Sequence, residues 1–134
     1  MAGHGVVLDT SAIVAILTRE VKAEVLVEQL LRASLRVVPT PCAAEALIVL
    51  NAKLGYDPAS VLYEFFREFD IELFAFSSKH LSWYNHAFQR YGKGRHPASL
   101  NMGDCFTYAM TKALGFPLLF TGNDFAQTDL VAAK

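Results

Sequence analysis

Four acidic residues stand in surroundings where a carboxylate is expected to do more than face solvent. Asp9 directly follows the apolar run VVL, Asp104 begins a helical segment, and Asp124 comes shortly after the apolar run LLF. Glu45 has mostly apolar neighbours three and four positions away, which predicts an apolar helix face where an unpaired charge is costly. Carboxylates brought together repel one another unless a divalent cation enters, and hard oxygen ligands select Mg²⁺ or Mn²⁺. The four acids therefore predict a metal site suited to phosphoryl transfer.

Each of these acids also has a structural interpretation that needs no metal. Asp9 could cap the helix that follows it, and Asp124 could be an ordinary turn residue. Asp104 could form a capping box with Asn101. Glu45 has no Lys or Arg within one helical turn, so its charge is the hardest of the four to explain without a cation.

Two hydroxyl residues accompany the acids. Ser11 lies just after Asp9 in the chain, and Thr121 lies just before Asp124. Their side chains are expected to hydrogen-bond a water molecule or the scissile phosphate, as groups around metal ligands commonly do. We therefore place Ser11 and Thr121 among the candidate catalytic residues.

The hydrophobic pattern predicts strands that alternate with helices. The expected strands cover residues 5–9, 36–39, 71–75 and 118–121. The expected helices cover residues 11–18, 21–34, 40–53, 57–69, 77–91 and 101–115. Helical crossovers join parallel strands, so the expected fold class is α/β, a three-layer α/β/α domain with a mainly parallel central sheet. The 134 residues are expected to form a single domain over 1–134, with residues 1–4 as a flexible lead.

The predicted topology decides where the acids meet. In an open parallel sheet, ligands bind at the edge formed by the carboxyl ends of the strands. Asp9, Glu45 and Asp124 follow predicted strands and are expected at that edge. Asp104 joins them if its helix begins at the same edge, which is consistent with the next strand beginning at the opposite one. All four acids are thus expected in one cleft.

Composition limits the kinds of partner and the cellular compartment. A formal net charge of −1 argues against a uniformly basic surface for nucleic acid, so any such contact must be local. No apolar stretch approaches the roughly 18 residues of a membrane helix, and the N-terminus lacks a secretory signal pattern. We therefore expect a cytoplasmic protein with no membrane contact. Cys42 and Cys105 lie in apolar helical patterns, and neither a disulfide nor a zinc site is predicted.

A basic segment precedes the helix of Asp104. Arg90, Lys93 and Arg95 form the densest run of positive charge and are candidate contacts for a phosphate-rich substrate. A solvated loop without such a role is the alternative. Tyr91 also has two interpretations, since it could stack on a base or fill the core.

Several segments together resemble a known family. They are VVLDTSA at residues 6–12, the helix that carries Glu45, LNMGDCFTYA at residues 100–109 and LLFTGNDF at residues 118–125. Over nearly the whole chain they resemble PIN-domain ribonucleases of the VapC toxin type. The resemblance implies a Mg²⁺- or Mn²⁺-dependent endoribonuclease that hydrolyses RNA by in-line attack of water on a phosphodiester. It also implies the toxin half of a toxin–antitoxin pair, usually a homodimer, that a VapB-type antitoxin inhibits.

The resemblance also assigns roles by position. The residues that match the acidic quartet of the family are Asp9, Glu45, Asp104 and Asp124. Asp9 and Asp104 are the strongest candidates for direct metal ligands, and Ser11 matches the small hydroxyl residue that commonly follows the first acid. Thr121 and Asn123 depart from the family, where a basic residue and an acid are common at these positions. A catalytically weak PIN-like module that only binds or interacts is therefore the alternative function.

Overall fold

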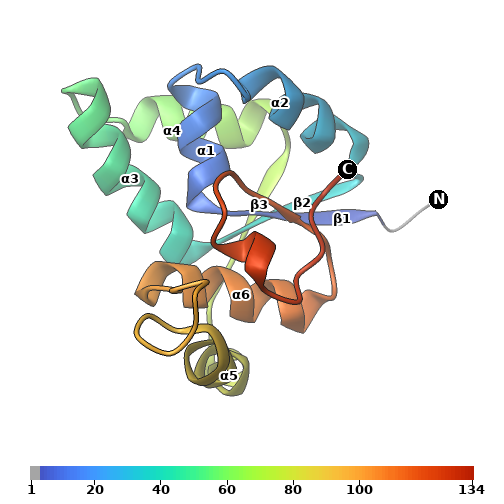
Figure 1. The fold of residues 1–134 in the computed structure, drawn as a ribbon. Coiled ribbons are helices and arrows are strands. Elements are labelled where there is room, and N and C mark those ends of the chain that lie inside the picture. Colours follow the sequence, from blue (N-terminus) through green and yellow to red (C-terminus); the bar gives the residue numbers. More distant parts are fainter. Residues whose placement is uncertain (1–3) are drawn as a thin grey trace.

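A parallel β-sheet crosses the middle of the molecule (Figure 1). The computed structural model describes residues 4–134. Within these residues the sheet has four strands in the order β3-β2-β1-β4. The strands are β1 (Gly5–Leu8), β2 (Leu35–Pro39), β3 (Ile71–Phe74) and β4 (Leu118–Leu119). All neighbouring strands are parallel, which confirms the prediction from the alternation of strands and helices.

Helices cover both faces of the sheet (Figure 1). One face carries α1 (Thr10–Leu17), α2 (Ala23–Arg32), α3 (Thr40–Leu54) and α4 (Ala59–Glu68). The other face carries α5 (Leu81–Tyr91), preceded by the short helix η1 (Ser78–His80), and α6 (Met102–Leu114). Within residues 4–134, no helix has the length and apolar character needed to cross a bilayer.

The strands contribute to a separate hydrophobic core on each face, because successive side chains of a strand point in opposite directions. Val6 and Leu8 of β1 pack in the core under α1 to α4, whereas Val7 packs in the core under α5 and α6. A strand buried on both faces reads as a continuous apolar run, which is how β1 appears in the sequence. The expected three-layer α/β/α architecture is confirmed.

Several boundaries differ from the predictions. β4 ends at Leu119 rather than at residue 121, because the Thr121 amide donates to the Ser11 hydroxyl at 3.1 Å and leaves the sheet. Gly122, with a φ of 90°, then turns the chain. α3 begins at Thr40, as expected, but no side chain caps its N-terminus. α2 is shorter than the predicted 21–34.

Both ends of the described chain are attached to the sheet. Residues 1–3 of the expected flexible lead lie outside the described residues, but the carbonyl of His4 accepts a hydrogen bond from the Ser34 amide at 2.8 Å. After β4 the tail forms the short helix η2 (Phe125–Gln127). It then returns to the sheet through a parallel bridge between Leu118 and Ala132.

Candidate active site

A pocket of about 300 Å³ lies at the carboxyl ends of β1 and β4. Three of the four predicted acids line it, and each comes from a different part of the chain. Its lining residues are Asp9, Thr10, Ser11, Val14, Glu20, Glu45, Val49, Asp104 and Thr121. The expectation that the strand-end edge brings distant acids together is therefore confirmed for Asp9, Glu45 and Asp104.

Asp9 is held in place by two hydrogen bonds. Its side chain is only 5% exposed, and its Oδ2 accepts from the Ser11 amide at 3.0 Å, which makes Asp9 the N-cap of α1. Its Oδ1 accepts from the Thr107 hydroxyl at 2.6 Å. Asp9 thus caps α1 and also lines the pocket. The buried carboxylate is fixed on both oxygens before any ligand arrives.

A buried chain of hydrogen bonds continues from Asp9 into the space between α3 and α6. The Cys42 sulfur lies 3.0 Å from the Thr107 hydroxyl oxygen. Burial, and then the negative charge of Asp9, raises the pKa of the Cys42 thiol to about 12. The thiol therefore keeps its proton and donates it to Thr107, whose own proton points to Asp9. Cys42 is buried, as its apolar helical pattern indicates, and its hydrogen bond orients the hydroxyl that holds Asp9.

Asp104 stands at the start of α6, where it exchanges hydrogen bonds with Asn101. Its Oδ2 accepts from the Asn101 amide at 3.0 Å, and its own amide donates to Asn101 Oδ1 at 2.9 Å. The pKa of Asp104 is raised to about 6, first by burial and then by the negative charges of Asp9, Asp124 and Glu45, whereas the Asn101 bond lowers it. The four acids therefore interact electrostatically across the pocket.

Glu45 lies half-buried at the edge of the pocket, on α3. The prediction that Glu45 lies on an apolar helix face is confirmed only in part, because its helical neighbour Cys42 is buried whereas Ile48 is 73% exposed. Glu45 faces the N-terminal turn of α6. A Cβ added to Gly103 would lie 2.7 Å from Glu45 Oε2, so the glycine leaves room for this carboxylate against the first turn of α6.

Asp124 is placed less centrally than the other three acids. It is exposed, precedes η2 and is absent from the pocket lining, although its charge acts on Asp104. Thr121 does line the pocket, and its amide donates to the Ser11 hydroxyl at 3.1 Å. Ser11 and Thr121 are therefore joined to each other directly beside Asp9.

The donor atoms of the pocket suit a hard divalent cation. Its polar lining consists of carboxylates and hydroxyls, which are the ligands that Mg²⁺ and Mn²⁺ prefer over softer nitrogen and sulfur donors. Within residues 4–134, however, no three acidic, histidine or cysteine side chains are close enough together to hold one ion. The carboxylates surround a common space without converging on one point.

The predicted basic contacts lie outside the pocket lining. Arg90, Lys93 and Arg95 are all exposed. The Arg95 guanidinium lies over the Phe88 ring, 4.9 Å from its centroid, and that of Arg90 lies 5.4 Å from the centroid of Tyr91. Tyr91 is 4% exposed and belongs to the core, so its interpretation as a base-stacking residue is wrong.

Sequence reasoning missed two residues of the pocket region. Thr107 contacts Asp9, and the signal for it was its position one helical turn after Asp104. Glu20 lines the pocket from the turn between α1 and α2, and no motif or spacing in the sequence indicated it.

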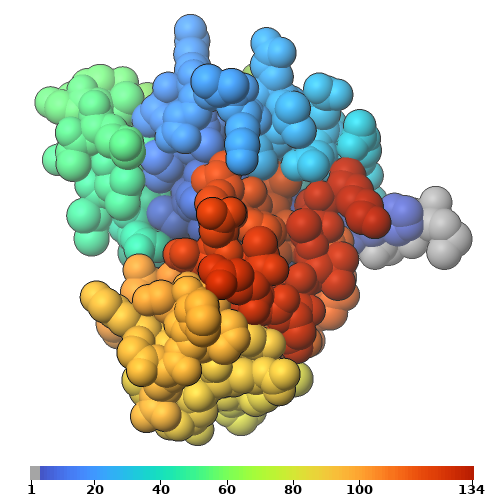
Figure 2. Space-filling view, in the orientation of Figure 1, coloured from blue at the N-terminus to red at the C-terminus, as the bar shows by residue number. Residues whose placement is uncertain are grey.

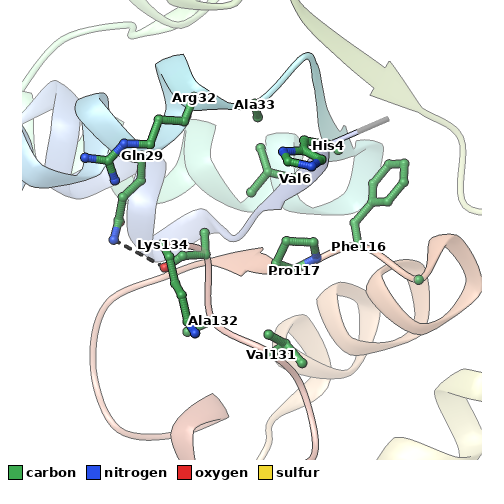
Figure 3. Close-up of a pocket in the computed structure, with 13 residues that line it drawn as sticks. His4, Val6, Gln29, Arg32, Ala33, Phe116, Pro117, Val131, Ala132 and Lys134 are labelled. Carbon is green, nitrogen blue, oxygen red and sulfur yellow. Dashed lines mark hydrogen bonds between the residues drawn. The ribbon is translucent and has the colours of Figure 1, made fainter. Parts of the chain in front are cut away.

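A larger cavity, of about 490 Å³, lies at the opposite edge of the sheet (Figure 3). His4 and Val6 at the start of β1, Pro117 before β4 and Arg32 at the end of α2 line it. Gln29 also lines this cavity and donates to the carbonyl of Ala133 at 3.2 Å. None of its described lining residues is an Asp or Glu. The volume of a cavity therefore does not show which one is the candidate active site, because the carboxylates line the smaller of these two.

Comparisons with known proteins show the family to which the chain belongs. Residues 6–131 match the PIN-domain family. Ribonuclease VapC36 of Mycobacterium tuberculosis is 42% identical over 92% of this chain and 90% of its own length. Ribonuclease VapC of Mycolicibacterium smegmatis is 40% identical over 94% of this chain and 98% of its own length. The crystal structure of Mycobacterium tuberculosis VapC20, described as a sarcin-ricin loop cleaving toxin, covers 96% of this chain and 98% of its own with a TM-score of 0.76. It shares the fold at 13% sequence identity.

Proposed function

This chain belongs to the PIN-domain family, and we propose that it is an endoribonuclease of the VapC type that hydrolyses RNA phosphodiester bonds. The observation that carries the proposal is the shared pocket at the carboxyl edge of the sheet. Asp9, Glu45 and Asp104 line it together although they come from distant parts of the chain. Relatives that bear the VapC ribonuclease name match 92% and 94% of this chain.

The proposal includes Mg²⁺ or Mn²⁺ as the cofactor, with Asp9 and Asp104 as direct ligands and Glu45 and Asp124 acting through bound water, because Mg²⁺ keeps several waters and needs only one or two carboxylates. The oxygen-only donor set supports this choice. The raised pKa of Asp104 supports it too, because a site that binds a proton this readily gains from any added positive charge. A cation bound there would supply an activated water and neutralise charge on the phosphodiester oxygens.

The chain's own residues have distinct tasks in this proposal. Asp9 is oriented by Ser11 and Thr107, and Asp104 is anchored by Asn101, so both carboxylates face the pocket in defined positions. The Ser11 and Thr121 hydroxyls are proposed to hydrogen-bond the attacking water or the scissile phosphate.

The basic segment is assigned a role outside the pocket. We propose that Arg90, Lys93 and Arg95 contact RNA phosphates. Their segment leads directly into α6, whose first turn carries Asp104.

Removal of divalent cations tests the proposed function. Cleavage of labelled RNA by the purified protein is expected to fall at least about 100-fold in a chelator and to return with added Mg²⁺ or Mn²⁺. The readout is the appearance of shortened RNA on a denaturing gel. Cleavage that persists at full rate in the chelator would contradict the cation requirement. RNA binding without cleavage in either metal would favour the alternative, a catalytically weak binding module.

Replacement of Thr107 tests whether the buried hydrogen bond to Asp9 contributes to the reaction. Thr107→Val removes the hydroxyl, and we expect about a tenfold loss of Mn²⁺ affinity or of cleavage rate, because Asp9 loses the donor that fixes Oδ1. Thr107→Ser retains the hydroxyl and is expected to stay close to wild type. Calorimetry with Mn²⁺ and a melting curve separate this effect from unfolding. A valine variant with wild-type affinity and rate would show that the bond is only structural.

The proposal extends to a VapB-type antitoxin partner, a homodimer and a cytoplasmic location. Large apolar side chains on the helices of one face support a protein partner, because a monomer seldom exposes many of them together. On α2, Val25 is 54% and Leu31 is 56% exposed, and on α3 Ile48 is 73% exposed. The acidic pocket would also accept a basic group from an inhibitor.

A further inference from the structure

A second hollow adjoins the acidic pocket on the side of the turn between α1 and α2. It has a volume of about 590 Å³, and its lining residues are Arg19, Glu20, Val21, Lys22, Thr121 and Gly122. Glu20 and Thr121 also line the acidic pocket, so the two hollows share a wall. Figure 2 shows the blue atoms of this turn directly beside the orange-red atoms of the segment after β4.

The two hollows differ in charge. The first is lined by carboxylates, whereas the second presents the exposed side chains of Arg19 and Lys22. Glu20 lies between them, and its Oε2 accepts from the Thr18 hydroxyl at 3.3 Å. In the part of the chain that the structure describes, the ion pairs join other residues, so neither Arg19 nor Lys22 forms a salt bridge, and with Glu20 the hollow carries two positive charges and one negative charge.

The backbone at Arg19 gives an independent reason to expect a task for its side chain. Arg19 has a φ of 56°, in the left-handed region that favours glycine. The Arg19 amide donates to the Ile16 carbonyl at 3.2 Å and the Glu20 amide to the Ala15 carbonyl at 2.9 Å. This is the Schellman pattern that ends many helices, in which the left-handed position is usually glycine. An arginine here costs folding free energy that a glycine would not, so its side chain is expected to act outside the fold.

We propose that Arg19 and Lys22 form a phosphate-binding subsite for RNA that continues the cleavage site along the substrate strand. This inference rests on the proposed ribonuclease function. A strand whose scissile phosphate enters the acidic pocket meets strong repulsion there, and cations in the adjoining hollow would hold a neighbouring phosphate. Arg90 and Arg95, by contrast, rest on their own aromatic neighbours and do not line either hollow.

The unusual backbone allows a sharp test. Arg19→Gly removes the charge but relieves the left-handed strain, so its melting temperature is expected to equal or exceed that of wild type. Binding to a fluorescent single-stranded RNA is measured by anisotropy in a chelator, so that no cleavage occurs, at several salt concentrations. We expect the Kd of Arg19→Gly and of Lys22→Ala to rise about 3- to 10-fold. The slope of log K against log salt should fall by about 0.7 for each variant.

Matched variants test whether weaker RNA binding is caused by the loss of positive charge. Arg19→Lys keeps the positive charge and is expected to bind RNA nearly as wild type does. Arg32→Ala removes an exposed cation at the opposite edge of the sheet and is expected to change neither the Kd nor the salt slope. An Arg19→Gly protein that binds with the Kd and salt slope of wild type would overturn the subsite. A wild-type protein that neither binds nor cleaves RNA would instead overturn the proposed function itself.

Discussion

Replacing Asp104 by asparagine is expected to lower RNA cleavage at least about 1000-fold without unfolding the protein. The neutral amide cannot hold a divalent cation as a carboxylate does, whereas its oxygen can still accept the Asn101 amide that caps α6. Asp9→Asn is expected to have the same effect, since Asp9 is the most buried acid of the site. The rates are measured as kcat/KM in excess Mn²⁺, and the melting temperature is measured alongside.

The control for this prediction is an acid outside the pocket. Asp70 is exposed and has a φ of 52°, a conformation that asparagine tolerates, so Asp70→Asn should cleave as wild type does. Equal cleavage by wild type, Asp9→Asn and Asp104→Asn would point to a contaminating nuclease and would remove the basis for the assigned site.

Mn²⁺ affinity is expected to rise about tenfold between pH 5 and pH 7 and then to level off. The pKa of Asp104 is raised to about 6, mainly by burial, so at pH 5 a proton competes with the metal for this carboxylate. Calorimetric titrations with Mn²⁺ at pH 5, 6 and 7 measure the change. An affinity that is flat over this range would show that Asp104 is already ionised at pH 5 or does not hold the metal.

The same group determines how metal-free stability depends on pH. Because the folded-state pKa of Asp104 lies above its ordinary value of 3.8, this carboxyl holds more protons in the folded protein than in the unfolded chain between about pH 4 and pH 6. This contribution to the free energy of unfolding therefore decreases as the pH rises through that window. Urea titrations without metal measure the decrease, and Asp104→Asn should lack this contribution.

Much of the fold could be predicted from local signals in the sequence. The buried run before Asp9 and the cap at Asn101 depend on a few neighbouring residues, and both were identified correctly. The end of β4 was not, because apolar residues continue to Phe120 and the strand is ended by a bond to Ser11 from a distant part of the chain.

In the candidate site, too, some residues could be predicted from local signals and others could not. Asp9 and Asp104 could be found because strand ends and helix starts fix their edge of the sheet. Thr107 had only its spacing from Asp104 as a signal, and Gly103 and Glu20 had none, because their importance arises from tertiary contacts with Glu45 and the pocket. The expectation for Glu45 held only in part because helical spacing does not show which apolar neighbours another helix will cover.

The order of the strands affects when catalysis becomes possible during synthesis. β1 emerges first from the ribosome, but one of its neighbours in the sheet, β4, is made more than a hundred residues later. A nascent chain that stops before α6 contains Asp9 and Glu45 but lacks both Asp104 and the hydroxyl that orients Asp9. If Asp104 takes part in the reaction as proposed, chains that stop before α6 are expected to be inactive, and RNA cleavage becomes possible only when synthesis is nearly finished.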